Sequence, residues 1–300
     1  MKLQTIKRPR FILTVILMRF NPLFPTKLYL KLLFKLRTGH FLNLKKPQTF
    51  GEKIQWLKVY NRQNYYSTLV DKVEVKNYVA PIVGAEHVIP TIGVWDRPEN
   101  IDWESLPNQF VLKTSHGGGS SGVVICKEKL DFDKKKAIDK LNRSMKQDIW
   151  GKLREWPYKN VKPRILAEKY IEPNLGNDLS DYKWYCFNGK PKYCQVIQDR
   201  TSKETIDFFD VNWNHQEFVG LNPKADRAVI PPQRPKNLEK QIEIATSLSK
   251  NIPFVRIDLY EIDDSVFFGE ITFYPMSGMG RFRPDEYNKI LGEMIELPKL

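Results

Sequence analysis

A glycine-rich loop stands between two runs of strand-forming residues in residues 110–126 (FVLKTSHGGGSSGVVIC). Glycines in such density permit the positive φ angles that let backbone N–H groups converge on an anion. Lys113, on the run that leads into the loop, adds a fixed positive charge for phosphate. The sequence therefore predicts a loop that covers nucleotide phosphates. The loop residues expected at the phosphates are His116, Gly117, Gly118, Gly119, Ser120, Ser121 and Gly122.

The loop fits three known glycine-rich patterns, and the residues on either side of it show which of them apply. The dinucleotide-binding pattern and the nucleophile elbow both require a helix after the loop, but Val123, Val124 and Ile125 are β-branched and predict a strand. The protein-kinase pattern tolerates a second strand, but its lysine follows the loop, and the sequence contains neither His-Arg-Asp nor Asp-Phe-Gly. We therefore expect a β-hairpin that folds over phosphates. A glycine-rich surface hairpin without a ligand remains an alternative.

A second hairpin is predicted in residues 254–280, where two strand-like runs flank the turn-forming aspartates Asp263 and Asp264. Successive side chains of a strand point to opposite faces, so every second residue shares a face. The side chains expected to share a face are Arg256, Asp258 and Tyr260 on the first run, and Phe268, Glu270 and Thr272 on the second run. The hairpin therefore gathers two acids and a base.

An odd-length loop centred near Asp264 places Asp258 opposite Glu270 and Arg256 opposite Thr272. Two facing carboxylates repel each other unless a cation lies between them. Oxygen ligands without cysteine or histidine favour Mg²⁺ or Mn²⁺, bound by one or two carboxylates together with substrate phosphates. The alternative is a solvated face on which Arg256 pairs with Asp258. The apolar residues around these positions favour buried strands and hence the metal site.

Two weaker signals lie between these hairpins. Residues 165–171 predict a short strand, and Asn188 with Gly189 marks a hairpin turn. Asp181 and Lys183 share one face of the strand before that turn, where an acid can bind ribose hydroxyls and a base can bind phosphate. Any exposed strand can carry such a pair, so this signal alone does not define a site.

The order of these motifs resembles the ATP-grasp superfamily. Upstream, Asp71 and Lys72 stand where many members place a first phosphate-binding lysine. Residues 45–58, 181–190 and 268–275 are similar to the teichuronopeptide-biosynthesis branch, which is associated with capsular and exopolysaccharide gene sets. The similarity extends from about residue 27 to the C-terminus and rests on several motifs in the same order.

The resemblance implies an α+β fold in which two lobes, each built on a mostly antiparallel sheet, clasp ATP. The glycine loop would be the lid over the phosphates, and the adenine contacts would be made largely by backbone groups. The implied ATP contacts are Lys72 and Lys113 for the phosphates, Glu168, Lys169 and Ile171 for adenine, and Asp181 for ribose, while Lys183 remains the phosphate-binding base expected beside Asp181.

The resemblance also implies that Asp258 and Glu270 hold Mg²⁺ and that Arg256 contacts the transferring phosphoryl group, with Lys113 as the second catalytic cation. One position departs from the family pattern. Better-studied ATP-grasp ligases have asparagine two residues after the metal-binding glutamate, and this sequence has Thr272. A hydroxyl can also bind magnesium, so Thr272 is the expected third ligand, but the departure weakens the expectation of a second metal ion.

The function implied is that of a ligase joining a carboxylate to an amine. ATP would convert the carboxylate to an acyl phosphate, which an amine then attacks, and the family context suggests a uronic acid and an amino acid of a surface polysaccharide. The substrate would be a small molecule or a lipid-linked saccharide. A kinase that phosphorylates a sugar or lipid hydroxyl, and a non-catalytic partner of a glycosyltransferase, remain alternatives.

The composition agrees with a cytoplasmic enzyme. The three cysteines are odd in number and lack C-x-x-C spacing, so the sequence has no disulfide framework. It contains no zinc finger and no RNA motif with interleaved aromatic residues, and we expect no nucleic-acid partner. Helices are also expected at residues 70–79, 130–148 and 237–250.

Positive charge is concentrated at the N-terminus. Residues 1–60 contain 13 lysines and arginines but only one acid, Glu52, so they account for +12 of the total net charge of +13. The apolar run at residues 11–18 is far shorter than the ~20 residues that span a bilayer. It also lacks a small-residue cleavage site, so it does not resemble a signal peptide. We expect a basic helical arm over residues 1–60 and a catalytic region over residues 61–300, with a flap lobe near 105–170 and a metal-binding lobe near 171–300.

Residues 26–40 predict a helix with a lysine stripe and a broad apolar face. Lys27, Lys31 and Lys35 form the stripe. Such a helix can lie in a membrane interface and attract anionic lipid, so residues 1–40 could bind the inner face of a membrane peripherally. Alternatively, the helix packs on the body of the protein while its lysines extend to solvent. The sequence favours neither alternative.

Overall fold

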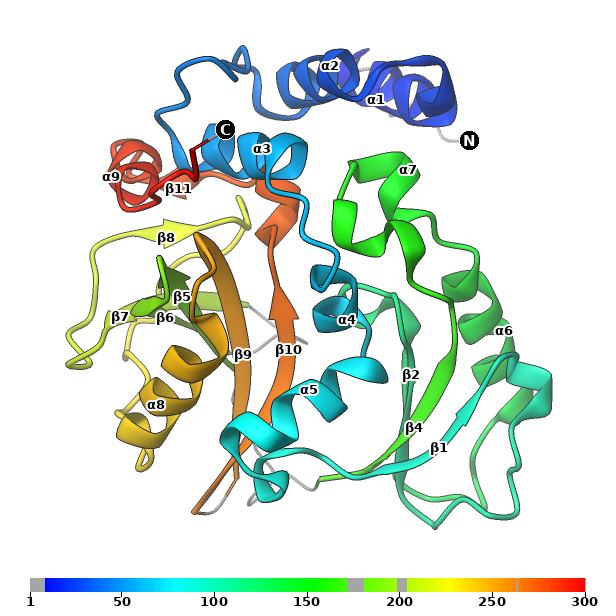
Figure 1. Ribbon diagram of the computed structural model, residues 1–300. Helices are drawn as coiled ribbons and strands as arrows, with labels where there is room; N and C mark the ends of the chain where they lie inside the picture. The colour runs from blue at the N-terminus through cyan, green and yellow to red at the C-terminus, as the bar shows by residue number, and fades with distance from the viewer. Residues whose placement is uncertain (1–8, 172–180, 199–203, 263, 300) are drawn as a thin grey trace.

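The computed structural model describes residues 9–171, 181–198, 204–262 and 264–299. The protein has an α+β fold with two antiparallel sheets, as expected (Figure 1). One sheet has the order β1-β4-β2-β3 and the other has the order β10-β9-β5-β6-β7. The strands are β1 (Thr91–Trp95), β2 (Phe110–Thr114), β3 (Val123–Cys126), β4 (Ile165–Lys169), β5 (Asp181–Phe187), β6 (Lys190–Gln198), β7 (Thr205–Asp210), β9 (Phe254–Ile262) and β10 (Ser265–Thr272), and a small ladder joins β8 (Val219–Gly220) to β11 (Phe282–Arg283).

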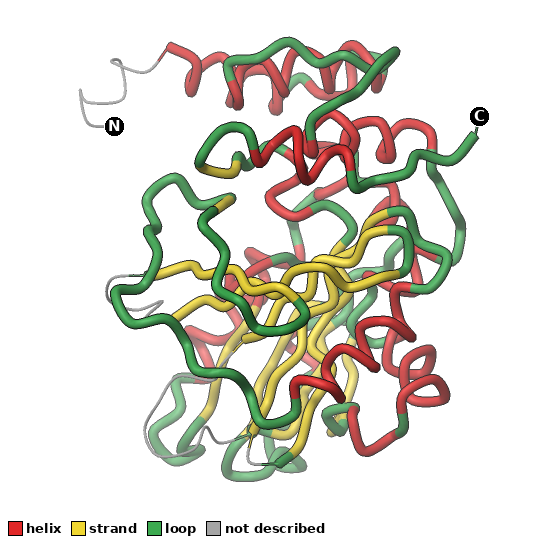
Figure 2. Tube along the Cα trace, turned by 90° about the vertical axis from the view of Figure 1, so that its left-hand side faces the viewer, coloured by secondary structure: helices red, strands yellow, loops and turns green. Residues whose placement is uncertain are grey.

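Helices surround the two sheets and form a separate layer at one end of the molecule (Figures 1 and 2). The end layer contains α1 and α2, while α8 packs on the five-stranded sheet and α6 packs on β2 and β3. None of the helices in the described residues is long and apolar enough to cross a membrane. The α-helices are α1 (Pro9–Arg19), α2 (Thr26–Thr38), α3 (Phe50–Tyr60), α4 (Tyr66–Val70), α5 (Glu74–Val83), α6 (Lys134–Met145), α7 (Ile149–Leu153), α8 (Leu238–Ser249) and α9 (Tyr287–Glu293).

Two hydrophobic clusters hold the sheets. The smaller cluster lies in the four-stranded lobe and includes Phe110 and Leu112 of β2 with Leu141 of α6. The larger cluster joins the five-stranded sheet to the N-terminal helices, including Leu30 and Leu33 of α2. The inner side of α2 is therefore part of the main core. Burial of large apolar side chains is the dominant favourable contribution to folding, so this contact should hold α2 firmly on the body.

The predicted glycine hairpin is confirmed. β2 pairs antiparallel with β3, with Lys113 opposite Val123, and the loop between them includes a 3₁₀ turn at Gly119–Gly122. The second predicted turn is confirmed as well. Phe187 pairs with Lys190, so Asn188 and Gly189 form a two-residue loop, and their φ angles of 50° and 78° are typical of the tight turn that such a sequence favours.

The helix expected at residues 70–79 is confirmed only from Glu74 onward, because the chain is interrupted between α4 and α5. Asp71 has an extended backbone, and its carboxylate accepts a hydrogen bond from the Val73 amide at 2.9 Å. The Lys72 amide donates to the carbonyl of Ser115 at 3.0 Å instead of continuing a helix. An aspartate side chain that accepts a hydrogen bond from a nearby backbone amide competes with helix formation. The bond from Lys72 to Ser115 then attaches this segment to the residue that follows β2.

The facing pairs of the second hairpin are confirmed, but the cause differs from the expected odd-length loop. Asp258 lies opposite Glu270 and Arg256 lies opposite Thr272. The register shifts at Gly269, where a β-bulge adds one residue to β10. A Cβ atom at Gly269 would lie 2.9 Å from the ring of Tyr260, so the bulge requires glycine.

This bulge corrects one expected face. Phe268 does not share a face with Glu270, because the extra residue reverses the alternation of side chains along β10. Phe268 pairs with Leu259 instead and is 4 % exposed in the main core. Glu270 and Thr272 retain the face that carries Asp258 and Arg256.

Candidate functional site

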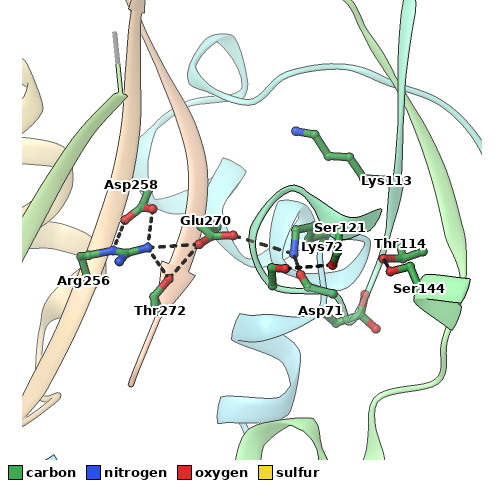
Figure 3. A network of polar contacts seen from close by, with 12 residues as sticks. Asp71, Lys72, Lys113, Thr114, Ser121, Ser144, Arg256, Asp258, Glu270 and Thr272 are labelled. Atoms are coloured by element: carbon green, nitrogen blue, oxygen red, sulfur yellow. Dashed lines mark hydrogen bonds and ion pairs between the residues drawn. The ribbon is translucent and has the colours of Figure 1, made fainter. Parts of the chain in front are cut away.

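The hairpin of β9 and β10 brings a base and two acids into one hydrogen-bonded group (Figure 3). The guanidinium of Arg256 donates to both oxygens of Asp258, at 2.6 and 2.7 Å. It also reaches an oxygen of Glu270 at 3.3 Å and the hydroxyl of Thr272 at 3.2 Å. Arg256 therefore pairs with Asp258, as the alternative to the metal site expected, but Asp258 is only 2 % exposed, so the group is buried and does not form a solvated face.

A lysine lies on the other side of Asp258. The ammonium of Lys183 is 2.6 Å from an oxygen of Asp258 and 2.7 Å from an oxygen of Asp181. The register explains this meeting, because Lys183 of β5 pairs with Asp258 of β9. All three side chains are buried. Two carboxylates can be buried so close together because a cation separates them.

Lys72 joins the two lobes of the site. Its ammonium lies 3.8 Å from Glu270 of β10 and donates to the carbonyl of Gly117 in the glycine loop (Figure 3). The neighbouring Asp71 is held by Arg164, whose guanidinium is 2.7 Å from its carboxylate. The break between α4 and α5 thus places Lys72 between the loop and the carboxylates.

Lys113 extends from β2 towards the side of the site where Glu270 and Asp258 lie (Figure 3). Its ammonium is 2.5 Å from one oxygen of Glu168, and Lys76 of α5 is 2.6 Å from the other oxygen. The side chain of Glu168 therefore bridges two cations. Lys169 follows Glu168 on β4 and is exposed, and its backbone amide donates to the carbonyl of Pro90 at 3.1 Å.

Three acids of the site, Asp258, Glu270 and Glu168, differ in proton affinity. Burial raises the pKa of Asp258, and Glu270 and Asp181 add to this, although Arg256 and Lys183 oppose it. Removal from water would also raise the pKa of Glu270, but Lys72, Arg256 and Lys183 outweigh that effect and lower it to about 2. For Glu168, Lys113 and Lys76 likewise outweigh burial and lower the pKa. Glu270 is therefore ionised over the whole neutral range and available to a cation.

The glycines of the loop fall into two groups. A Cβ atom at Gly117 or Gly122 would lie 2.5 or 2.1 Å from the hydroxyl oxygen of Thr114, which itself bonds Ser144 at 2.8 Å. These two glycines allow the loop to pack closely on β2 and α6. Gly118 and Gly119 would meet nothing within 4 Å, so their backbone faces open space, and Gly119 has a φ of +64°. The second pair is therefore the part of the loop best placed to approach a ligand.

The remaining loop residues close this turn. The Ser121 hydroxyl donates to the carbonyl of Gly118 at 3.3 Å and accepts from the Gln147 side chain at 3.1 Å. His116 is 5 % exposed at the foot of the loop. Burial lowers the pKa of its imidazole, and the nearby ammonium of Lys72 lowers it further, so a neutral His116 is favoured. Ser120 contributes backbone to the 3₁₀ turn.

The structure brings most of the expected site residues together. Lys72, Lys113 and the glycine loop lie on one side, and Asp258 and Glu270 lie on the other (Figure 3). Ile171 is the last described residue before the gap at 172–180, at the end of the segment that continues from β4. Asp181, the first described residue after the gap, lies beside Lys183. The ATP and metal roles of these residues remain predictions.

Sequence reasoning missed Lys76. It lies four residues after Lys72, and its ammonium bonds the carbonyl of Ile89 at 2.7 Å as well as Glu168. The spacing of four residues was a usable signal only on a continuous helix, which the break at Asp71 excludes. Its contact with Glu168 depends on packing between α5 and β4, which no local pattern reveals.

Comparison with known proteins gives one family match. A family model described as TupA-like ATPgrasp matches residues 52–296. No curated protein matches this sequence. The match confirms the resemblance to the ATP-grasp superfamily and agrees with the teichuronopeptide-related branch.

Two solved ligases resemble the fold at low identity. The D-alanine–D-alanine ligase from Bacillus anthracis is 18% identical, with 74% of this chain and 64% of that chain covered and a TM-score of 0.42. The corresponding ligase from Helicobacter pylori is 15% identical, with 83% and 69% covered and a TM-score of 0.43. The chain thus spans a little under two thirds of the B. anthracis ligase. At these scores the likeness carries no argument about activity.

Proposed function

Because the chain belongs to the TupA-like ATP-grasp family, we propose that it is an ATP-dependent carboxylate–amine ligase that works through an acyl phosphate. The observation that carries this proposal is the position of Lys72. One ammonium group contacts both the glycine loop, through Gly117, and the acidic hairpin, through Glu270. A triphosphate placed there would lie between a cationic lobe and a pair of carboxylates, which is the arrangement that phosphoryl transfer needs.

The carboxylates fit a hard divalent cation. Asp258 and Glu270 face each other across β9 and β10, and Glu270 retains 32% exposure of its side chain. In the described residues no three side chains of His, Cys, Asp or Glu come together as a metal cluster, so phosphate oxygens would complete the shell. When bound, Mg²⁺ or Mn²⁺ would neutralise charge on the ATP phosphates. The Thr272 hydroxyl donates to Glu270 at 2.9 Å and orients it.

In the structure each cation of the site already has a carboxylate partner. Arg256 and Lys183 pair with Asp258, Lys72 pairs with Glu270, and Lys113 pairs with Glu168. ATP binding would therefore exchange these internal ion pairs for phosphate contacts. These partners hold the cations near the site before the nucleotide arrives.

The reaction follows from this placement. An oxygen of the substrate carboxylate attacks the γ-phosphorus, the bond to the β–γ bridging oxygen breaks, and ADP leaves. Arg256 would stabilise the charge that develops on the transferring phosphoryl group. An amine then attacks the acyl carbon, phosphate leaves, and the amine nitrogen loses a proton. The residues named here orient reactants and offset charge, and none of them forms a covalent intermediate.

A cavity of about 690 Å³ lies beyond the end of β10 and is a suitable place for the second substrate. Its volume lies within the range of small-molecule pockets, ~300–1,000 Å³. Its lining is mainly apolar and includes three arginines, Arg37, Arg281 and Arg283, and one acid, Asp285, which pairs with Arg281. An acidic saccharide with a carboxylate would find positive charge there, which supports a uronic acid or an amino acid derivative of a surface polysaccharide as substrate.

One part of the cavity wall, Met276 and Ser277, lies shortly after Thr272 in the chain and belongs to a turn with an unusual backbone. Met276, Ser277 and Gly278 have φ angles of 47°, 58° and 65°. Lys58, fully buried in α3, holds this turn by donating to the carbonyl of Ser277 at 2.8 Å and to its hydroxyl at 2.6 Å. A non-glycine backbone in this region persists only where its surroundings impose it, and such strain is typical of ligand sites.

Trapping with hydroxylamine tests the proposal. With ATP and Mg²⁺, candidate uronic acids and amino acids are screened for ADP and phosphate release and for hydroxamate formation. The ligase should form a hydroxamate only when the carboxylate and ATP are both present, because hydroxylamine intercepts the acyl phosphate. A stable phosphoester on a sugar hydroxyl, with little free phosphate, would identify a kinase instead. Failure of the protein to bind ATP would favour a non-catalytic role.

A further inference from the structure

The two N-terminal helices leave an apolar surface exposed at one end of the molecule. α1 and α2 pack against each other as the outermost layer in Figures 1 and 2. The outer face, as used here, comprises Phe11, Val15, Ile16, Phe20, Leu28 and Leu32. The first four of these side chains are each 48–56% exposed. We propose that the outer face docks on an anionic membrane surface.

The inner sides of the helices are already used. Tyr29 and Leu33 of α2 are fully buried in the main core, and the Tyr29 hydroxyl donates to the carbonyl of Lys152 at 2.7 Å. Arg154 lies over the Tyr29 ring and bonds the carbonyl of Asn21 at 2.7 Å, which fixes the connection between the helices. The layer is therefore anchored to the body, and the exposure of its outer face is not the result of a detached arm.

The sequence of α1 is unlike that of an ordinary surface helix. Between Arg10 and Arg19 it has no charged residue, and Thr14 and Leu17 are its only buried residues. A helix that is apolar all round is normally enclosed by protein or lipid. Its 11 residues extend about 16 Å, so it is too short to span the hydrocarbon layer, and the charged side chains of a helix layer that lies in a membrane interface come mainly from its neighbour α2.

The positive charge around the outer face favours an anionic membrane over a second copy of the chain. Residues 9–46 contain eight lysines and arginines and no aspartate or glutamate. Lys27 and Lys31 are exposed beside Leu28 and Leu32 of α2. A second copy of the chain would bring like charges together at this face, whereas anionic headgroups complement the charges and the acyl boundary receives the apolar side chains. The outer face therefore matches an anionic bilayer better than it matches itself.

Docking would also orient the candidate second-substrate cavity. Arg37 and Thr38 at the end of α2 line that cavity, so it opens beside the layer that would touch the membrane. A substrate carried at the membrane surface would be close to it. The docking proposal itself rests on α1 and α2 and is independent of the proposed ligase activity.

Vesicle binding of the full chain tests the proposal. Cosedimentation is measured with phosphatidylcholine vesicles that contain or lack phosphatidylglycerol, at low and high salt. We expect binding only to the vesicles with phosphatidylglycerol, weakening with salt because screening shortens electrostatic attraction to about 10 Å at 0.1 M. Lys27→Gln with Lys31→Gln should lower the partition coefficient by about fivefold for each lysine. Phe11→Ser with Ile16→Ser should lower it about tenfold or more.

Matched controls use residues of the same kind elsewhere on the surface. Lys127→Gln with Lys135→Gln removes two other exposed lysines. Val229→Ser with Ile230→Ser removes two apolar side chains that are 100% and 83% exposed. Both controls should retain wild-type binding, and circular dichroism confirms that each variant is folded. The lysine pair keeps the test decisive if the apolar pair alters folding.

Three results would overturn the proposal. The first is no binding of the wild-type chain to the anionic vesicles at low salt. The second is an equal loss of binding in the matched controls. The third is a dimer, detected by light scattering without lipid, that dissociates in the Phe11→Ser with Ile16→Ser variant, because the face would then bind a second copy.

Discussion

The ammonium of Lys72 lies 3.8 Å from the carboxylate of Glu270, and these two residues come from segments almost 200 positions apart in the chain. This contact joins the lobe that carries the glycine loop to the hairpin that carries the acids. It exists because the chain breaks between α4 and α5 and because the bulge at Gly269 turns Glu270 towards Asp258.

Lys113 should contribute directly to ATP binding. Lys113→Ala removes one charge-assisted phosphate contact, worth ~1.5–3 kcal/mol, so ATP affinity should fall at least about tenfold. Isothermal titration calorimetry measures the ATP affinity. The matched control is Lys135→Ala, which removes an exposed lysine of α6. Unchanged affinity in Lys113→Ala would remove Lys113 from the nucleotide site.

Glu270→Gln should abolish Mg²⁺-dependent turnover, because the neutral amide no longer attracts the metal ion. It should also lower the unfolding temperature at neutral pH, since Lys72 and Arg256 lose an anionic partner. Asp258→Asn should abolish turnover too and lower the unfolding temperature further, because Asp258 is more deeply buried and pairs with both Arg256 and Lys183. Thr272→Ala should be milder than either. Turnover near that of the wild type in Glu270→Gln would contradict the metal assignment.

The acid sensitivity of the protein should depend on Lys72. The pKa of Glu270 is about 2 in the folded protein and lower than its ordinary value of 4.5, so its ionised form stabilises the fold above pH 4.5. That contribution is lost as the pH falls from 4.5 towards 2. Lys72→Met should raise the folded pKa of Glu270 and flatten the pH dependence of the unfolding free energy in this window. Urea unfolding at several pH values measures the unfolding free energy of the wild type and the variant. If this free energy changes equally with pH in both proteins, Lys72 does not act on Glu270.

The two groups of loop glycines should respond differently to substitution. Gly122→Ala would place a methyl group 2.1 Å from the Thr114 hydroxyl oxygen and should lower both stability and ATP affinity. Gly118→Ala meets nothing within 4 Å and should leave stability unchanged. Thermal unfolding and ATP titration of the two variants give the comparison. Equal stability of the two variants would show that the loop does not pack on Thr114 as described.

Local patterns predicted the elements whose causes are themselves local. The glycine hairpin, the Asn188–Gly189 turn and the helix near residues 26–38 follow from turn chemistry and side-chain periodicity over a few residues. The facing of Asp258 and Glu270 was also predicted, although the odd-length loop assumed for it is replaced by a bulge. Either device adds one residue to the hairpin, so the register came out the same.

Features that depend on distant contacts were not predicted. Glycine is required at the bulge because the ring of Tyr260 on the neighbouring strand would lie too close to a Cβ atom at position 269. The break at Asp71 is held by Arg164, 93 residues away in the sequence. Lys76 reaches Glu168 only after α5 and the four-stranded sheet have packed together. Sequence periodicity carries no information about such contacts, because it reports only the environment along one element.

The measurement that tests the ligase most directly is positional isotope exchange in ATP labelled with ¹⁸O at the β–γ bridge. With Mg²⁺ and a substrate carboxylate, but without the amine, reversible formation of an acyl phosphate lets the β-phosphoryl group of ADP rotate before ATP is reformed. We predict that the label then moves from the bridge to the non-bridging β positions, and that Arg256→Ala and Glu270→Gln prevent this. Exchange that requires a sugar hydroxyl and proceeds without any carboxylate would contradict the account.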